Sequence, residues 1–222
     1  MNLVFAMSAW MFVCALIGTV YGALRFLTKR SALYLQMIAC GVGCQMFARL
    51  FNVVYIALYG ELRREFNIGM LGIVGSLLFI LSANYGQMDS LVDDGDASLR
   101  PTRRRALIAP MAVLALYAFF CCMEHDAHLR LAVGLVTAFI LPTAYYNFKH
   151  LIIYDVEGGV IRGLRKYNLL ALMYSFFVLL EFIFGYLSYN VPYVMACIGV
   201  GAVTLTMMPA LKRGLEEWTE AT

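Results

Sequence analysis

The sequence predicts an all-α, polytopic integral membrane protein: a seven-transmembrane-helix bundle with its N-terminus outside and its C-terminus in the cytoplasm. Three observations predict this fold, namely the composition, a series of long charge-free runs, and the uneven distribution of Lys and Arg. Of the 222 residues, 62% are hydrophobic and 14% are charged, whereas soluble domains average about 45–50% and about 25%. This composition excludes a water-soluble enzyme, a disordered chain, a disulfide-stabilised secreted module and a free nucleic-acid-binding protein.

The charge-free runs give the seven helices in order. A helix that crosses a bilayer needs about 20 mostly apolar residues. The expected spans are 3–24, 32–59, 67–87, 106–123, 131–148, 167–187 and 193–211. Pro192 separates the last two, because proline opens a helix more easily than it continues one. Residues 1–213 are therefore expected to form a single seven-helix transmembrane domain, followed by a short cytoplasmic tail at 214–222.

The basic residues set the expected orientation, because loops rich in Lys and Arg stay in the cytoplasm. With the N-terminus outside, thirteen of the 17 Lys and Arg residues fall in inner connections or directly after the last span, three fall in outer connections, and Arg49 lies within a span. Most tyrosines fall near the expected span ends, as is typical of interfacial aromatic residues. We expect the plasma membrane as the location. The basic inner face needs no nucleic acid to explain it.

The inner connections are longer than the outer ones and are candidate docking surfaces. Connections 88–105 and 149–166 lie on the cytoplasmic side, and the first contains the basic run Arg103, Arg104 and Arg105. Most loops of this kind are simply solvated. The alternative is that these arginines bind a separate cytoplasmic protein partner.

Two opposite charges within the spans are the sharpest functional signal. A charge near the bilayer centre costs about 2.5–3.5 kcal/mol and usually faces a bundle interior. Arg49 in the second span and Glu181 in the sixth differ in expected depth by about one helical turn, so an ion pair is geometrically allowed. Gln45 and Asn52 share the helix face of Arg49. The pair either fixes the helix arrangement or, with Gln45 and Asn52, binds a small ligand in a polar pocket open to the outside.

A second polar group is expected near the cytoplasmic side. Its residues come from the ends of the third and fifth spans and from the sixth span, and they are Asn84, Tyr85, Tyr145, Tyr146, Asn147 and Tyr174. Interfacial anchoring explains most of them. The alternative is the wall of an inner cavity.

No cofactor or metal is expected. The six cysteines lie within spans, form no Cys-x-x-Cys pair, and are not interleaved with histidines at zinc-site spacing. His125 and His128 share an outer connection, where a polar turn explains them more simply than a metal site. Asp89 and Asp93 lack the second acidic cluster that a magnesium-dependent diphosphate enzyme would need, so an enzyme is the less favoured class.

Small residues spaced four apart are typical of close helix contacts in membranes. Gly72 and Ser76 have this spacing in the third span, and Cys40, Cys44 and Ala48 have it in the second. Contacts within one bundle are the favoured interpretation, with a homo-oligomer as the alternative.

These observations favour a receptor-like sensory protein that binds a small ligand near Arg49 and Glu181 and signals to a cytoplasmic partner. The alternative is a small-molecule transporter or channel that uses the same polar residues. A retinal protein is disfavoured, because the seventh span has no lysine within it.

Overall fold

The computed structural model is all-helical and describes residues 3–28, 31–63, 65–89, 93, 95, 97–153 and 160–219. Its α-helices are α1 (Leu3–Gly22), α2 (Leu33–Tyr59), α3 (Ile68–Ala83), α5 (Arg100–Ala106), α6 (Ile108–Met123), α7 (Ala127–Ile152), α8 (Val160–Tyr186) and α9 (Asn190–Thr219). Two π-helical turns, η1 (Ala23–Leu27) and η2 (Asn84–Met88), extend α1 and α3, and a 3₁₀ turn, η3 (Ala97–Leu99), precedes α5.

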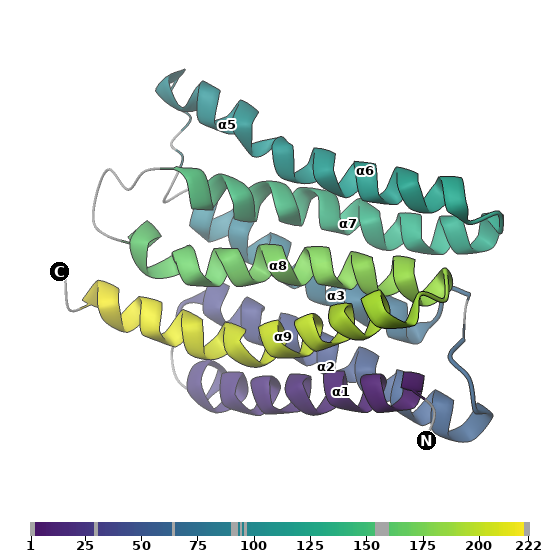
Figure 1. Cartoon of the computed structure of the whole chain (residues 1–222). Helices are drawn as coiled ribbons and strands as arrows, with labels where there is room; N and C mark the ends of the chain where they lie inside the picture. The colour runs from purple at the N-terminus through teal and green to yellow at the C-terminus, as the bar shows by residue number, and fades with distance from the viewer. Residues whose placement is uncertain are drawn as a thin grey trace.

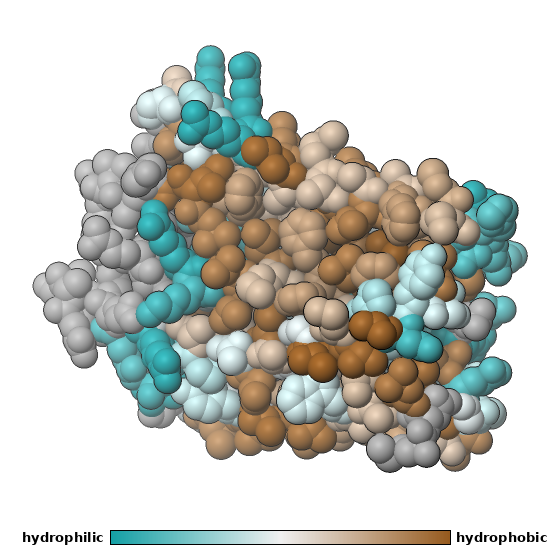
Figure 2. Space-filling view, in the orientation of Figure 1, coloured by the Kyte–Doolittle hydropathy of each residue, from teal (hydrophilic) through white to brown (hydrophobic). Residues whose placement is uncertain are grey.

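Seven helical segments are long and apolar enough to cross a membrane. Six of these segments centre on α1, α2, α3, α7, α8 and α9, and the seventh runs from η3 through α5 and α6. On the face shown in Figure 2, apolar residues cover the middle of the bundle and hydrophilic residues gather at its two ends. This arrangement indicates an integral membrane protein.

Six of the helices form a closed ring. The helices in contact are α1 with α2, α2 with α3, α3 with α7, α7 with α8, α8 with α9, and α9 with α1. Helix α6 packs mainly on α7 and lies at the edge of the bundle (Figure 1). Side chains that point inward from α2 and α8 therefore meet inside the ring.

The ends of the helices follow from local sequence. Gly60 ends α2 in the left-handed conformation, with φ of +80°, which glycine adopts without steric cost. The Asn67 side chain caps α3 by accepting a hydrogen bond from the backbone N–H of Met70 (3.2 Å), and Asp126 caps α7 in the same way from His128 (2.8 Å).

Several helices are longer than the sequence predicted. Helices α7 and α8 begin at Ala127 and Val160, where spans starting at 131 and 167 were expected. Helix α9 continues to Thr219, so most of the expected tail 214–222 is helical, and residues 220–222 lie outside the described part of the chain. Charged residues end an apolar run without ending a helix, because they can extend into the interface.

Helix α1 begins and α9 ends at opposite ends of the bundle (Figure 1). We use "outer end" for the end at which α1 begins and "inner end" for the other.

Candidate functional site

A buried ion pair crosses the interior of the ring. The Arg49 guanidinium on α2 and the Glu181 carboxylate on α8 form a bidentate pair: Nη1 donates to Oε1, and Nη2 donates to Oε2 at 2.6 Å. Arg49 is 0% exposed and Glu181 is 6% exposed. Two parallel N–H···O bonds hold the carboxylate in one orientation. The pair therefore fixes the rotation of α2 and α8 relative to each other.

Polar neighbours complete the hydrogen bonding of Arg49. With its amide oxygen toward the guanidinium, Gln45 accepts from Arg49 Nε (2.9 Å) and Nη2 (3.2 Å), and its amide nitrogen donates to the Tyr174 hydroxyl (2.7 Å). This orientation satisfies both ends of the amide. The Tyr174 hydroxyl in turn donates to Ser76 Oγ on α3 (3.2 Å). We call Gln45, Arg49, Ser76, Tyr174 and Glu181 the central network; it joins α2, α3 and α8.

A vestibule of about 240 Å³ lies at the outer end of the bundle, and Glu181 is part of its lining. The lining residues are Val4, Asn52, Glu61, Leu62, Arg63, Glu181, Phe182, Phe184, Gly185, Tyr186, Ser188, Asn190 and Tyr193. Arg49 is absent from this lining. The Glu181 carboxylate therefore binds the fully buried Arg49 and also borders a cavity that a small molecule can occupy.

Asn52 lies in the vestibule wall and packs closely against α3. It is buried, and a Cβ atom added to Gly69 would collide with its Oδ1 atom. Glycine at position 69 therefore leaves room for the amide of Asn52. Of the four predicted ligand-binding residues, Glu181 and Asn52 line the vestibule, and Arg49 and Gln45 lie behind it.

The residues predicted for an inner cavity separate into three places. Asn84 and Asn147 are buried and joined by a hydrogen bond from Nδ2 of Asn84 to Oδ1 of Asn147 (2.8 Å). Tyr146 makes edge-on ring contacts with Tyr85 (5.4 Å between centroids) and Tyr145 (5.1 Å). Tyr85 is 63% exposed, which is the placement of an interfacial anchor. The sixth predicted residue, Tyr174, belongs to the central network instead.

An ion cluster at the inner end joins the connection after α3 to the end of α7. Lys149 pairs with Asp89 and with Asp93 (2.9 Å to Oδ2), His150 Nε2 lies 3.1 Å from Asp89 Oδ1, and Arg103 Nε donates to Asp93 Oδ2 (2.8 Å). We call Asp89, Asp93, Arg103, Lys149 and His150 the inner ion cluster. It ties α5 and the connection before it to the end of α7.

The cluster lowers the pKa of both carboxyl groups. Burial raises the pKa of Asp89, but hydrogen bonds from His150 and Lys149 outweigh this effect and bring it below the ordinary 3.8. The hydrogen bond from Arg103 lowers the pKa of Asp93 and outweighs the opposing effect of burial. The hydrogen bond from Lys149 lowers it further, so the pKa of Asp93 lies well below its ordinary value. Both aspartates are therefore charged at neutral pH.

The sequence does not reveal this cluster, because Lys149 and His150 are more than 50 residues from Asp89 and Asp93 along the chain, although Arg103 is close to both aspartates. The spacing of Asp89 and Asp93 suggests a magnesium site or a solvated loop, and Lys149 and His150 lie at the start of connection 149–166, for which a solvated loop is also the simpler expectation. A signal was present: both carboxylates and the Lys-His pair lie at the same expected depth, just past the inner ends of two spans.

The arginines predicted to dock a partner differ in their surroundings. Arg103 is held by Asp93, whereas Arg104 and Arg105 are exposed on α5. Residues 90–92, 94 and 96 of the first inner connection and 154–159 of the second lie outside the described part of the chain. Among the residues that are described, no group of three His, Cys, Asp or Glu side chains is placed to hold a metal ion.

A comparison of this chain with protein-family models, curated proteins and solved structures found no match.

Proposed function

We propose that this protein is a receptor-like, sensory membrane protein that binds a small organic cation in the outer vestibule and signals to a separate cytoplasmic partner. We also propose an N-terminus outside, a C-terminus in the cytoplasm, and a location in the plasma membrane. The orientation is supported by the excess of Lys and Arg in the inner connections. The observation that carries the proposed activity is the double role of Glu181, which lines the vestibule and holds the sealed Arg49.

The charges and rings of the vestibule favour a cation. Among the residues that the structure describes, its lining contains two carboxylates, Glu61 and Glu181, and one arginine, Arg63. The side chains of Phe182, Tyr186 and Tyr193 also contribute to the wall. Aromatic faces attract cations by about 0.5–2 kcal/mol, and a carboxylate with little exposure to water strengthens that attraction.

A bound cation would compete with Arg49 for the Glu181 carboxylate. A ligand shifts a conformational equilibrium only through different contacts in the two states, and sharing Glu181 supplies such a difference. Weakening the pair would release the constraint between α2 and α8. Helix α8 packs on α7, whose last turn carries Lys149 and His150 of the inner ion cluster. This contiguous packing supports a route from the vestibule to the exposed Arg104 and Arg105.

The test uses the full chain in lipid nanodiscs and phenethylammonium as the cation probe, with neutral 2-phenylethanol as the matched control ligand. We expect Glu181→Gln to weaken phenethylammonium binding by about tenfold or more, equivalent to about 1.4 kcal/mol. Glu61→Gln, which removes an exposed carboxylate of the same vestibule, should weaken binding by a smaller factor and should not threaten folding. Glu124→Gln, which removes a carboxylate from another outer connection, should have no effect. Equal binding by the wild type and both vestibule variants, or equal binding of the alcohol, would overturn the proposal.

A second candidate function is transport of the same class of molecule. The observation that favours it is a set of buried polar atoms without a hydrogen-bond partner among the described residues, namely Asn84 Oδ1, His150 Nδ1, Arg165 Nε, Tyr167 Oη and Asn168 Oδ1. These atoms belong to the inner half of the bundle, where a path from the vestibule would continue. Saturable uptake of phenethylammonium into proteoliposomes, abolished by Arg49→Ala, would identify a carrier, and binding without uptake would favour the receptor.

A further inference from the structure

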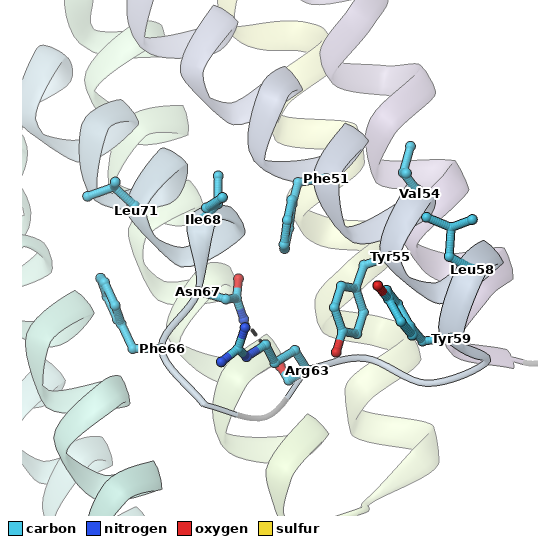
Figure 3. A pocket seen from close by; sticks show the side chains of 10 residues that line it. All are labelled: Phe51, Val54, Tyr55, Leu58, Tyr59, Arg63, Phe66, Asn67, Ile68 and Leu71. Carbon is cyan, nitrogen blue, oxygen red and sulfur yellow. Dashed lines mark hydrogen bonds between the residues drawn. The ribbon is translucent and has the colours of Figure 1, made fainter.

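A second hollow lies at the outer end, on the side of the bundle formed by α2 and α3. It is a groove of about 560 Å³ between the last turns of α2 and the start of α3, bordered by the connection between them (Figure 3). Most of its wall is apolar or aromatic, with Phe51, Val54, Leu58, Phe66 and Leu71 among the lining residues. Its volume falls within the about 300–1,000 Å³ that is typical of small-molecule sites.

The polar groups of the groove gather at one end. Of the ten lining side chains, Arg63 is the one that carries a charge. In Figure 3 its guanidinium lies near Asn67, and the Tyr55 hydroxyl points toward the connection that carries Arg63. The Tyr55 and Tyr59 rings are in contact at 4.6 Å between centroids. An apolar wall with a cation and a hydroxyl group at one end matches an amphiphile with an anionic head.

Local hydrogen bonds hold the backbone that carries Arg63. Asn67 Nδ2 donates to the carbonyl oxygens of Arg63 (3.2 Å) and Glu65 (2.9 Å), while its Oδ1 caps α3. Arg63 Nη2 also donates to Glu65 Oε2 (3.1 Å), in a pair whose two side chains are exposed. Exposed ion pairs contribute little to stability, and this one occupies one terminal nitrogen of a group with five N–H donors. A phosphate can therefore compete for Arg63.

We infer that this groove binds a phospholipid with an anionic head group, taken from the leaflet at the outer end. The acyl chains lie along Phe51, Val54 and Leu71, and the phosphate accepts hydrogen bonds from Arg63, whose planar fork matches phosphate geometry. Tyr55 adds a hydroxyl at the level where tyrosine concentrates in membranes. This inference rests on the proposed membrane insertion and not on the cation-binding activity of the vestibule.

The site has a consequence for the vestibule, because Arg63 lines both hollows. A phosphate bound to Arg63 neutralises the one arginine in the vestibule lining. Anionic lipid is therefore expected to strengthen binding of an organic cation there.

The test is native mass spectrometry of the full chain released from nanodiscs that contain equal amounts of phosphatidylglycerol and phosphatidylcholine. We expect the wild type to retain the anionic lipid in preference to phosphatidylcholine by about fivefold, the effect of about one basic residue near a membrane surface. Arg63→Gln should remove this preference. Arg130→Gln removes an arginine from a different outer connection and should keep the preference. Glu65→Gln removes the carboxylate that competes for Arg63 and should increase the preference. No organic cation is present, so the result is independent of the vestibule.

A bulky substitution locates the lipid without changing any charge. Val54→Trp, at an exposed position in the groove wall, should reduce retention of the anionic lipid, whereas Leu114→Trp, at an exposed position on α6, should not. The inference would be overturned by an unchanged preference in Arg63→Gln, by an equal loss in Arg63→Gln and Arg130→Gln, or by a lipid-free dimer that Val54→Trp dissociates. Retention of inorganic phosphate in place of lipid would overturn it as well.

Discussion

At the scale of single residues, the central network predicts strongly non-additive mutational effects. Glu181→Gln leaves the Arg49 charge buried without its counter-ion, which should cost about 3–5 kcal/mol of stability, whereas the double variant Arg49→Met with Glu181→Leu should cost less than the sum of its single variants. Thermal unfolding in detergent micelles measures both. Arg63→Gln, at an exposed pair, serves as the control and should change stability by about 0.5 kcal/mol or less. A double variant as unstable as the summed singles would contradict the burial of the pair.

The same residues show how far the sequence alone predicts the site. The depth of Arg49 and Glu181 in the spans could be predicted, because a charge in an apolar run is conspicuous and the helical rise converts sequence position into depth. Gln45 could be placed near Arg49 by its spacing. Tyr174 could not, because the rotation of α8 is fixed by packing against several helices at once. The division of roles, with Glu181 lining the vestibule and Arg49 sealed behind it, also depends on that rotation.

At the scale of the elements, the spacing of small residues predicted close helix contacts, and the structure identifies one of them between α2 and α3. Gly72 on α3 faces α2 so closely that an added Cβ atom would lie 2.9 Å from Ala48 Cβ and 3.1 Å from the Cys44 carbonyl oxygen. The spacing of small residues could indicate this face. It could not indicate the partner helix, because a stripe of small residues can pack closely against any neighbouring helix.

Gly72→Ala is therefore expected to force α2 and α3 apart and to destabilise the protein by about 1–3 kcal/mol, the usual cost of overpacking. The matched control is Gly86→Ala, because an added Cβ atom at Gly86 meets nothing within 4 Å. Unfolding temperatures of the two variants give the comparison. Equal unfolding temperatures for Gly72→Ala and Gly86→Ala would contradict the close approach of α2 and α3 at Gly72.

The inner ion cluster predicts a loss of stability in acid. The pKa values of Asp89 and Asp93 are lowered in the folded protein, so their contribution is complete above the ordinary value of 3.8 and is lost as the pH falls below it. The wild-type unfolding temperature should therefore start to fall at about pH 4 to 5 and should continue to fall well below pH 3.8, until the lowered pKa values of the folded protein are passed. Asp93→Asn should be less stable at neutral pH and should lose less on acidification.

The control for this pH series is Glu65→Gln, which removes an exposed carboxylate and should leave the acid loss unchanged. An acid loss of the same size in Asp93→Asn and the wild type would show that the cluster does not set this dependence.

At the scale of the whole molecule, the number and order of helices followed from hydropathy, whereas the ring did not. Hydropathy gives lengths and depths, and it contains no information on which helix lies beside which. The contact between α3 and α7 closes the ring and leaves α6 outside. That arrangement decides which polar residues meet: Glu181 reaches Arg49 across the interior, and Lys149 reaches Asp89 at the inner end.

The proposed orientation predicts that the two ends of the chain lie in different compartments. Reporter fusions that are active only in the cytoplasm should work after Thr222 and fail before Met1, because the basic connections remain inside. Removing positive charge with Arg104→Gln and Arg105→Gln tests whether these residues contribute to the orientation. Activity at both ends would contradict an odd number of crossings.

The central claim is that the charge at position 181 selects the ligand of the vestibule, and exchanging the two charges tests it most directly. The double variant Arg49→Glu with Glu181→Arg keeps an opposite-charge pair in the interior but places an arginine in the vestibule lining. Binding of phenethylammonium and phenylacetate, which share a ring and differ in charge, is measured for the wild type and for the monodisperse double variant. The account predicts that the wild type prefers the ammonium and that the exchanged protein prefers the carboxylate. A folded double variant that still prefers the ammonium would contradict it.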